Sequence, residues 1–546
     1  MPITEFLERN AKIYPDDVAL VEINPANQPE KHTTWKDFSL IETAVGGKYR
    51  REMTWKEFDT KANRFANLLM TRDVKRGDKV AILLMNCLEW LPIYFGVLKT
   101  GAIVVPMNYR YSAEEIRYCV DLADVRMLIF GPEFLERVNA VKDQMTGLTD
   151  LFYVGEQNET PVYASNYDKL TRFCSTTCPP VQLNDEDDGA IYFSSGTTGF
   201  PKAILHRHRA LVSSCYTEQH HHSQTKEDVF LCIPPLYHTG AKMHWFGSLL
   251  TGSKAVILRG VSPEWIFETV SRERATIVWL LVPWAQDILD AIDRGELDPN
   301  DFQLSQWRLM HIGAQPVPQS LIKRWKKVFP HHDYDTNSGL SESIGPGCVH
   351  LGVENVDHVG AIGKAGYLWE TKIVDENLII VDPGQVGELA VRGPGVMKEY
   401  YKNPKATEEI LKGDWLLTGD MAREDEDGFI WLVDRKKDVI ISGGENLYPV
   451  EIEDFMRSNE KISDVAVIGL PDKRLGEIAA AVIQIKEGMS SSEEEMNAFL
   501  EGLPRYKRPR KLIFADVPRN ATGKIEKPKL REIYGSVRLV EAQNQG

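Results

Sequence analysis

A run of small and hydroxylated residues follows an apolar segment near residue 192 and has the composition of a phosphate-binding loop. Residues 192–202 read YFSSGTTGFPK. Glycine lets backbone N–H groups turn inward without a Cβ clash, serine and threonine add hydroxyl donors, and Lys202 adds a positive charge. Such a loop can surround a polyphosphate. It is not a Walker A loop, because the pattern Gly-x4-Gly-Lys-Ser/Thr is absent. A solvated surface loop of the same composition is the alternative.

Seven further motifs follow this loop along the chain. They are residues 234–240 (PPLYHTG), 311–316 (HIGAQP), 339–342 (GLSE), 387–389 (GEL), 417–420 (LTGD), 434–444 (DRKKD followed by Gly-Gly) and 518–525 (PRNATGKI). Together with the loop, they resemble in type and order the signature motifs of the adenylate-forming superfamily. That superfamily includes acyl-CoA synthetases, aryl-CoA ligases, luciferases and peptide-synthetase adenylation domains. The resemblance extends from about residue 55 to residue 534.

The resemblance implies an AMP-forming acyl-CoA synthetase, related to ligases of aromatic or alicyclic acids. In the implied reaction, a carboxylate attacks the α-phosphate of ATP, which gives an acyl-adenylate and pyrophosphate. The thiol of coenzyme A (CoA) then displaces AMP. The protein must neutralise the triphosphate, align the carboxylate and exclude water. The implied cofactors are ATP or AMP, Mg²⁺ and CoA. The physiological direction stays open, because a cell can run the reaction to make ATP.

The resemblance also assigns residues to the nucleotide. Glu342 is expected to coordinate Mg²⁺, which prefers oxygen ligands, and Ser341 to contact the α-phosphate. Asp420, helped by Arg435, is expected to accept hydrogen bonds from the ribose hydroxyls. The other residues expected to hold the nucleotide and its phosphates are Ser194, Ser195, Gly196, Thr197, Thr198, Gly199, Lys202, Gly313, Ala314, Gln315, Ser338 and Gly339.

A lysine near the C-terminus is the implied catalytic cation. Lys524 is expected to bridge the carboxylate and the α-phosphate as negative charge develops, and its long stem allows it to be withdrawn. Lys437 stands at the implied hinge, where a φ/ψ change rotates a small C-terminal domain between the two half-reactions. One orientation presents Lys524, and the other presents the loop of Gly443 and Gly444 beside a pantetheine channel. Glu342, Thr197 and His238 complete the residues expected to take part in catalysis.

The acyl group is expected to contact the chain after His238 and the loop after Glu342. The expected residues are His238, Thr239, Ala241, Lys242, His244, Trp245, Gly313, Ser343, Ile344 and Gly345. Inward-pointing His244 and Trp245 would shorten the pocket, which favours a short-to-medium, aromatic or alicyclic acid over a long fatty chain. A satisfied core histidine is the alternative for His238.

Two features depart from simple expectations. Many members of the superfamily have tyrosine next to the adenine, where this chain has Ser338, so we expect weaker nucleotide binding because an aromatic contact is lost. Residues 220–222 are three consecutive histidines. Adjacent residues point in different directions on a helix, so a solvated helix end is favoured there over a metal site.

Short apolar runs alternate with amphipathic stretches and predict an α/β fold with largely parallel sheets. The predicted strands are 80–85, 102–106, 191–193, 230–233, 255–258, 277–282 and 309–312. We expect a large N-terminal domain over residues 1–433, with mixed or parallel sheets packed by helices and a small β-barrel-like lobe. A small mobile α+β domain follows over 434–546. A polar insertion is expected at about 24–53, and it contains a near-copy, beginning at Thr34, of the segment that begins at Thr54.

Composition limits the remaining functional classes. The chain has 546 residues, 43% of them hydrophobic, and a formal net charge of −15. That charge argues against nucleic acid or an anionic membrane as the main partner, and we expect no stable membrane insertion. Seven scattered cysteines favour reduced thiols in a cytoplasmic protein. We expect a carboxylic acid and CoA as partners, and possible homodimer formation. The alternatives are an enzyme that loads a carrier protein, a fatty-acid CoA ligase, and a nucleotide-binding protein without catalysis.

Overall fold

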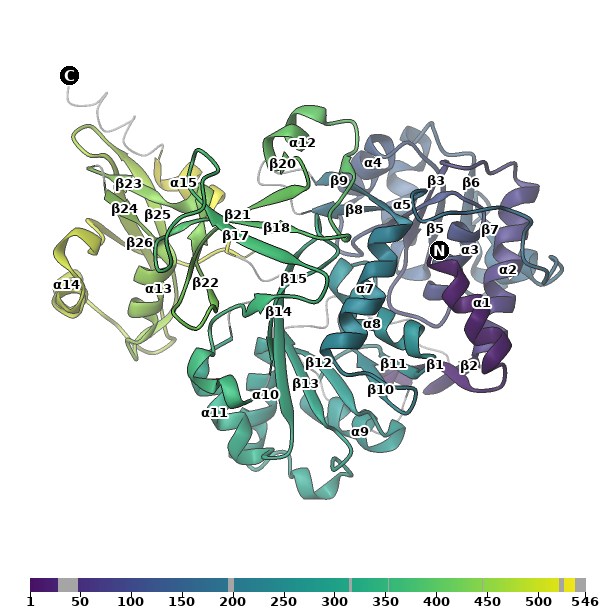
Figure 1. Ribbon diagram of the computed structural model, residues 1–546, viewed down its shortest axis with the longest axis horizontal. Helices are drawn as coiled ribbons and strands as arrows, with labels where there is room; N and C mark the ends of the chain where they lie inside the picture. Colours follow the sequence, from purple (N-terminus) through teal and green to yellow (C-terminus); the bar gives the residue numbers. More distant parts are fainter. Residues whose placement is uncertain are drawn as a thin grey trace. The chain divides into compact units, whose positions relative to one another are not determined.

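The computed structural model describes residues 1–27, 48–194, 201–313, 317–351, 353–443, 445–519 and 525–535 (Figure 1). It divides into two compact units, Met1–Thr371 with Val391–Leu416, and Lys372–Ala390 with Leu417–Gly546. The prediction of a mixed α/β protein with a large N-terminal and a small C-terminal domain is confirmed. The expected boundary at Asp434 falls inside the second unit, which also takes in residues that precede it.

The first large sheet is built around parallel strands with antiparallel strands at both edges. Within the described part of the chain its spatial order is β16 (Lys364–Ala365), β15 (Gly345–Leu351), β14 (Asp333–Leu340), β13 (Leu309–Gly313), β12 (Ile277–Leu281), β10 (Val229–Cys232), β11 (Lys254–Leu258), β1 (Val18–Ile23) and β2 (Arg50–Thr54).

The second large sheet is also mainly parallel, and antiparallel β9 and β19 lie at one edge. Its described strands run in the order β19 (Glu399–Tyr400), β9 (Lys202–Arg207), β8 (Asp188–Ser194), β4 (Ile103–Pro106), β3 (Lys79–Leu83), β5 (Val125–Phe130), β6 (Asp150–Tyr153) and β7 (Ser165–Asn166). The two sheets contain all seven strands predicted from the sequence.

Side-chain alternation shows why these strands are apolar throughout. Val80 and Ile82 belong to one buried cluster, whereas Ala81 and Leu83 belong to another on the opposite face of β3. Successive side chains of a strand point to opposite faces, so a strand buried on both faces is apolar at every position. The largest cluster also includes Leu20 of β1, so it joins the inner faces of both sheets.

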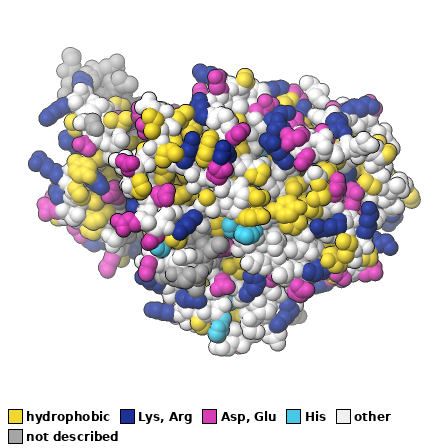
Figure 2. Space-filling model, in the orientation of Figure 1, with side chains coloured by type: hydrophobic (Ala, Val, Ile, Leu, Met, Phe, Trp, Pro, Cys, Tyr) yellow, Lys and Arg dark blue, Asp and Glu magenta, His cyan; other side chains and the backbone are white. Residues whose placement is uncertain are grey.

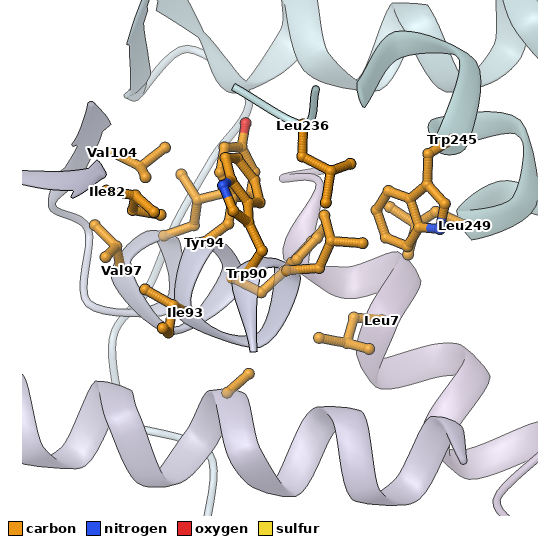
Figure 3. Close-up of a cluster of buried hydrophobic side chains, with 14 of the residues drawn as sticks. Leu7, Ile82, Trp90, Ile93, Tyr94, Val97, Val104, Leu236, Trp245 and Leu249 are labelled. Atoms are coloured by element: carbon orange, nitrogen blue, oxygen red, sulfur yellow. The ribbon is translucent and has the colours of Figure 1, made fainter. Parts of the chain in front are cut away.

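Helices fill the space between the sheets and cover their outer faces. Trp90, Tyr94, Trp245 and their neighbours form part of the buried cluster between the sheets (Figure 3). The helices that contribute to it are α1 (Thr4–Ile13), α2 (Trp55–Thr71), α3 (Trp90–Lys99), α7 (His208–His221) and α8 (Thr239–Thr251). The outer faces are packed by α9 (Pro263–Glu273), α10 (Val282–Asp293) and α11 (Gln319–Val328) on the first sheet, and by α4 (Ala113–Leu122) and α5 (Leu135–Val141) on the second.

Helix α2 begins at the second of the two near-copies. The Thr54 side chain accepts a hydrogen bond from the Glu57 N–H at 3.2 Å, and the Glu57 carboxylate accepts one from the Thr54 N–H at 2.8 Å. This capping box fixes the first turn of the helix. Most of the expected 24–53 insertion, including the copy that begins at Thr34, lies outside the described residues. Strand β2 forms the last part of this expected insertion and pairs with β1.

A smaller five-stranded sheet and a C-terminal sheet follow. The former contains β17 (Glu370–Val374), β18 (Gly387–Arg392), β20 (Leu411–Lys412), β21 (Trp415–Glu424) and β22 (Ile430–Arg435), with α12 (Pro404–Ile410) before β20. The latter contains β23 (Ile440–Ser442), β24 (Glu445–Leu447), β25 (Ile462–Asp472), β26 (Gly476–Ile485) and β27 (Lys511–Phe514). Helices α13 (Pro449–Arg457) and α14 (Glu493–Phe499) pack in one apolar cluster with the C-terminal sheet, and α15 (Lys527–Gly535) packs in another. Among the described helices, none is both long and apolar enough to cross a bilayer.

Candidate functional site

Strands β8 and β9 form an antiparallel pair on either side of the predicted phosphate loop. Ser194, the last residue of β8, is paired with Lys202, the first residue of β9. The Lys202 ammonium lies 4.8 Å from the centre of the Tyr400 ring. Ser195, Gly196, Thr197, Thr198 and Gly199 lie outside the described residues. The structure therefore brings together the two ends of the expected loop, with a cation at one of them.

Tyr400 links this cation to the carboxylate expected to hold Mg²⁺. Its hydroxyl donates to Oε1 of Glu342 at 2.7 Å, and the Met397 N–H donates to the Glu342 carbonyl oxygen at 2.7 Å. Burial and the Glu342 carboxylate raise the pKa of Tyr400. The phenol therefore stays a donor at neutral pH. A carboxylate orientated in this way is a suitable oxygen ligand for Mg²⁺, so the residues fit that ion. The sequence motifs did not point to Tyr400.

The segment after β14 is held in a defined conformation. The His206 ring bonds through Nε2 to the Ser341 carbonyl oxygen at 2.8 Å, and burial lowers the pKa of His206 to about 4. A neutral imidazole has one N–H, which serves as the donor here. The buried Ser343 hydroxyl contacts the carbonyl oxygens of Leu340 and Gly345 at 3.1 and 2.9 Å. These bonds fix the turn that carries Glu342.

Ile344 in this turn has an unusual backbone conformation. Its φ is 39°, and its side chain is buried. Positive φ is rare for a β-branched residue and costs free energy, so it persists only where the surroundings enforce it. The Ser214 hydroxyl bonds to the Ile344 carbonyl oxygen. At Gly345, a Cβ atom would lie 2.9 Å from the Trp369 ring. The expected acyl-site residues Ser343, Ile344 and Gly345 thus form one tightly packed turn.

Nucleotide-site residues also come from the ends of neighbouring strands. Strand β13 ends at Gly313, and the parallel strand β14 carries Ser338 and Gly339 before the turn. Carboxyl ends of adjacent parallel strands are a common place for ligands. A Cβ at Gly313 would lie 3.7 Å from the Thr336 hydroxyl, an ordinary contact distance. Ala314 and Gln315 lie outside the described residues.

Ser338 provides a test of how the adenine is held. We expect Ser338→Tyr to raise AMP affinity by about twofold to tenfold, because an aromatic contact contributes roughly 0.5–1.5 kcal/mol. Isothermal titration calorimetry measures this affinity. Asn337→Tyr is the control, because adjacent residues of β14 point to opposite faces. Equal or weaker AMP binding by Ser338→Tyr would contradict the expectation.

In the second unit, the residues expected to hold the ribose face each other. Asp420 of β21 is paired with Arg435 of β22, and Nε of Arg435 lies 2.9 Å from Oδ1 of Asp420. The Asp420 side chain is 9% exposed. Glu388 accepts hydrogen bonds from the Gly419 N–H at 3.1 Å and from the Lys436 ammonium at 2.8 Å. This carboxylate therefore ties the 417–420 motif to the segment before the expected hinge.

The expected hinge and the two C-terminal motifs are partly described. Lys437 is exposed within a short 3-10 turn, Lys436–Asp438. Gly443 has a φ of 62°, which favours glycine, and its N–H donates to the Leu475 carbonyl oxygen at 2.8 Å. Gly444 and Lys524 lie outside the described residues. Arg519 and Ile525, which lie within the 518–525 motif on either side of Lys524, form an isolated antiparallel bridge.

Several residues expected around the acyl group lie at the start of helix α8 or beside β12 and β13. His238 is exposed and caps helix α8, because its Nδ1 accepts the Gly240 N–H at 3.1 Å. Thr239 and Ala241 are buried in the first turn of the helix. The His244 ring lies 4.5 Å from the Trp279 ring and 4.0 Å from the His311 ring, measured between centroids. His244 is thus surrounded by other rings from β12 and β13.

Lys242 and Trp245 contact other parts of the protein interior, and their expected role at the acyl group stays a prediction. The Lys242 ammonium donates to the Leu236 carbonyl oxygen at 2.7 Å and lies 4.4 Å from the centre of the Tyr192 ring. Trp245 packs against Phe58, and Figure 3 shows Trp245 within the buried cluster. Adjacent helix residues are about 100° apart around the axis. His244 and Trp245 therefore point in different directions from α8.

The expectation of a solvated helix end at residues 220–222 is corrected. His220 is exposed and stacks on Tyr367 with 4.1 Å between ring centroids. His222 is only 2% exposed and lies beside His244 and His311. The contacts of His220 and His222 could not be predicted from the three consecutive histidines, because their partners lie far away in the sequence.

Comparisons with known proteins show which family and which enzymes the chain is similar to. Residues 7–401 match the family described as AMP-binding enzyme, and residues 451–524 match the AMP-binding enzyme C-terminal domain. The chain is 30% identical to the long-chain-fatty-acid–CoA ligase FadD13 of Mycobacterium tuberculosis, over 89% of this chain and 93% of that one. It is 29% identical to the indoleacetate–CoA ligase of Aromatoleum aromaticum, over 90% and 95% of the two chains. The crystal structure of the anthranilate CoA ligase AuaEII with anthranoyl-AMP superposes with a TM-score of 0.82 at 25% identity, covering 99% of this chain and 98% of that one.

Proposed function

The chain belongs to the AMP-binding enzyme family, and we propose that this AMP-forming acyl-CoA synthetase acts on a short-to-medium aromatic or alicyclic carboxylic acid. It uses ATP and CoA and proceeds through an acyl-adenylate. A carboxylate oxygen of the acid attacks the α-phosphorus of ATP, and pyrophosphate leaves. The CoA sulfur then attacks the carbonyl carbon, and AMP leaves with its electron pair.

In the first half-reaction, we assign charge neutralisation to Lys202, Glu342 and Lys524. Lys202 and the loop after Ser194 would hold the outer phosphates. Glu342 would hold Mg²⁺, which neutralises phosphate charge when bound. The hydrogen bond from Tyr400 orients Glu342 and places that carboxylate near Lys202. Preorganised charges of this kind stabilise the transition state without reorganising during the reaction.

We assign binding of the ribose to Asp420 and Arg435. We assign the hinge for the domain rotation between the two half-reactions to Lys437. The Asp420 carboxylate keeps acceptor capacity for ribose hydroxyls beside its contact with Arg435. Rotation at Lys437 would withdraw Lys524 and bring the loop of Gly443 and Gly444 to the thioester-forming step. Hinge residues absorb such a change without touching substrate.

The aromatic and imidazole rings beside the expected acyl residues favour a compact acid as the substrate. His244, Trp279 and His311 pack against one another beside the expected acyl residues, and this is the observation that carries the proposed substrate class. A Cβ at Gly240 would lie 3.0 Å from the Trp279 ring, so this ring fits closely against the start of α8. A long alkyl chain would have to displace these buried rings. Two relatives act, by their names, on acids that carry aromatic rings, indoleacetate and anthranilate.

The substrate class is tested by measuring kcat/KM for CoA-dependent AMP formation across a panel of acids. The panel contains benzoate, cyclohexane carboxylate, branched short acids and fatty acids. We expect the ring-containing acids to exceed palmitate by at least about tenfold, the order of discrimination that a few methylenes allow. Trp279→Leu should shift the preference toward longer acids. Trp284→Leu removes a buried tryptophan from a separate cluster and should leave the preference unchanged.

Two outcomes of the panel would overturn the substrate proposal. A preference for long fatty acids would favour the fatty-acid alternative, in line with the name of FadD13. Transfer of the acyl group to a carrier protein with no transfer to CoA would favour the carrier-loading alternative. Either outcome leaves the adenylate chemistry in place.

We further propose that the enzyme acts in the cytoplasm and forms a homodimer, as many members of the superfamily do. The seven cysteines are free thiols, in keeping with a reducing compartment. Basic and acidic side chains are interspersed on the face drawn in Figure 2, which supports small-molecule partners rather than nucleic acid. Light scattering coupled to size-exclusion chromatography measures the mass, and a mass of one chain would overturn the dimer.

A further inference from the structure

Three histidines from separate elements meet in the interior of the first unit. His222 follows the end of α7, His244 lies in α8, and His311 lies in β13. Each side chain is at most 2% exposed. The ring centroid of His222 lies 5.6 Å from that of His244 and 5.2 Å from that of His311. The ring centroids of His244 and His311 are 4.0 Å apart. One ring nitrogen of each histidine lies within 4.8 Å of the others.

Two buried carboxylates orient these rings. Nδ1 of His244 lies 2.5 Å from the Glu218 carboxylate, and Nδ1 of His311 lies 2.5 Å from the Asp335 carboxylate. A carboxylate accepts the proton on Nδ1, which leaves the Nε2 lone pair of the same ring available as a ligand. Metal-binding histidines usually have this carboxylate behind them. The arrangement therefore supplies both the ligands and the groups that orient them.

Some of the remaining nitrogen atoms lack partners. Nε2 of His311 and Nδ1 of His222 are buried and have no hydrogen-bond partner in the structure. Nε2 of His222 lies 3.5 Å from both Glu218 and Asp335, so its other nitrogen is the one left without a partner. Buried polar atoms without partners are uncommon and call for an explanation. A cation between the three rings would give a partner to one nitrogen atom of each histidine.

Two buried carboxylates also belong to the group. Glu218 and Asp335 are at most 2% exposed. Among the described residues, the ion pairs of these two carboxylates are to histidines and none is to lysine or arginine. A divalent cation would place a compensating charge beside them.

We propose that His222, His244 and His311 bind one divalent transition-metal ion, with Zn²⁺ as the best fit. Imidazole nitrogens suit zinc and its neighbours in the first transition row, whereas Mg²⁺ prefers oxygen. A tetrahedral zinc ion places its nitrogen ligands about 3.3 Å apart. Because the nitrogen atoms lie within 4.8 Å of one another, they must approach by up to about 1.5 Å on binding. Three protein ligands leave a fourth coordination position for another donor.

This site is distinct from the expected Mg²⁺ site at Glu342, although it borders the acyl residues. His311 precedes Gly313 by two residues on β13, and His244 belongs to the helix that begins after His238. The ion would connect α7, α8 and β13. The proposal does not depend on the identity of the acid, and its test does not measure turnover.

The test uses the full chain without a polyhistidine tag. Zinc is measured by inductively coupled plasma mass spectrometry after purification from zinc-supplemented medium. Co²⁺ is then titrated into chelator-treated protein and followed by its d–d absorption. We expect about one zinc ion per chain and a tetrahedral Co²⁺ spectrum. His222→Gln should abolish the spectrum, and Glu218→Gln should weaken Co²⁺ binding by about tenfold to a hundredfold.

His220→Gln is the matched control, because His220 is exposed and adjacent in sequence to the cluster. It should bind metal as the unaltered chain does. Circular dichroism and the thermal midpoint establish that each variant is folded, and Glu218→Gln keeps the test valid if His222→Gln fails to fold. Zinc well below one equivalent together with no Co²⁺ spectrum in the unaltered chain would overturn the proposal. Co²⁺ binding that is equal in the unaltered chain and in folded Glu218→Gln and His222→Gln would also overturn it.

Discussion

Replacement of Lys524 by alanine is expected to reduce acid-dependent adenylate formation by at least about a hundredfold. Removal of one preorganised group that stabilises developing charge costs roughly 10²–10³ in rate. The assignment follows from the 518–525 motif, and the bridge between Arg519 and Ile525 flanks it. The measurement is single-turnover formation of acyl-adenylate from ATP and the preferred acid, followed by rapid quench.

The second half-reaction separates this role from a loss of folding. When Lys524→Ala is given synthetic acyl-adenylate and CoA, we expect thioester formation at close to the rate of the unaltered enzyme, because Lys524 is withdrawn in that step. Lys529→Ala is the control, since Lys529 is exposed on α15 and pairs with Glu526 at 3.8 Å. Unchanged adenylate formation in Lys524→Ala would remove Lys524 from the catalytic site.

Glu342→Gln is expected to lower the rate of adenylate formation by about a hundredfold and to raise the Mg²⁺ concentration needed for half-maximal rate. Glutamine keeps the size of the side chain but removes the charge that attracts a hard divalent cation. The measurement is the initial rate of AMP formation as a function of free Mg²⁺ at fixed ATP.

Tyr400→Phe provides a graded comparison with Glu342→Gln. It removes the 2.7 Å hydrogen bond to Glu342 but leaves the carboxylate in place. A hydrogen bond to a charged group contributes about 1.5–3 kcal/mol, which corresponds to roughly tenfold to a hundredfold in rate, so we expect a loss in the lower part of that range. Glu370→Gln is the control, because Glu370 is a surface residue paired with Arg392. Equal Mg²⁺ dependence in Glu342→Gln and the unaltered enzyme would contradict the assignment.

The strands and the motif residues at their ends were predictable from the sequence. Strands such as β3 and β10 are buried on both faces, so they form continuous apolar runs that stand out from their surroundings. Ser194 and Gly313 end such strands, and their position in the fold follows from that of the strands. Helix α2 was predictable for a different reason, because Thr54 and Glu57 make a local capping box.

Contacts between distant segments were not predictable. The bond from Tyr400 to Glu342 joins residues 58 positions apart, and neither residue type reveals the pairing. Side-chain direction was equally hidden: Lys242 and Trp245 match the expected acyl segment in sequence, yet their helical positions direct them to Tyr192 and Phe58. Periodicity predicts that a helix exists better than it predicts which neighbour each side chain meets.

The histidine cluster illustrates the same limit. Three consecutive histidines drew attention to residues 220–222, but a helix directs them apart, and only His222 is fully buried. Its partners His244 and His311 lie in α8 and β13, which approach His222 only in the folded chain. The sequence therefore predicted a solvated helix end at a position where His222 belongs to a buried cluster.

The central claim is that the acid becomes an acyl-adenylate, and oxygen labelling tests it most directly. The acid is supplied with ¹⁸O in both carboxylate oxygens, together with ATP, Mg²⁺ and CoA. Attack on the α-phosphorus transfers one carboxylate oxygen to AMP, while the other stays in the thioester. We expect mass spectrometry to find one ¹⁸O atom in each AMP, none in pyrophosphate, and equal amounts of AMP and acyl-CoA. Turnover with no label in AMP, or with label in phosphate or pyrophosphate, would contradict the adenylate mechanism.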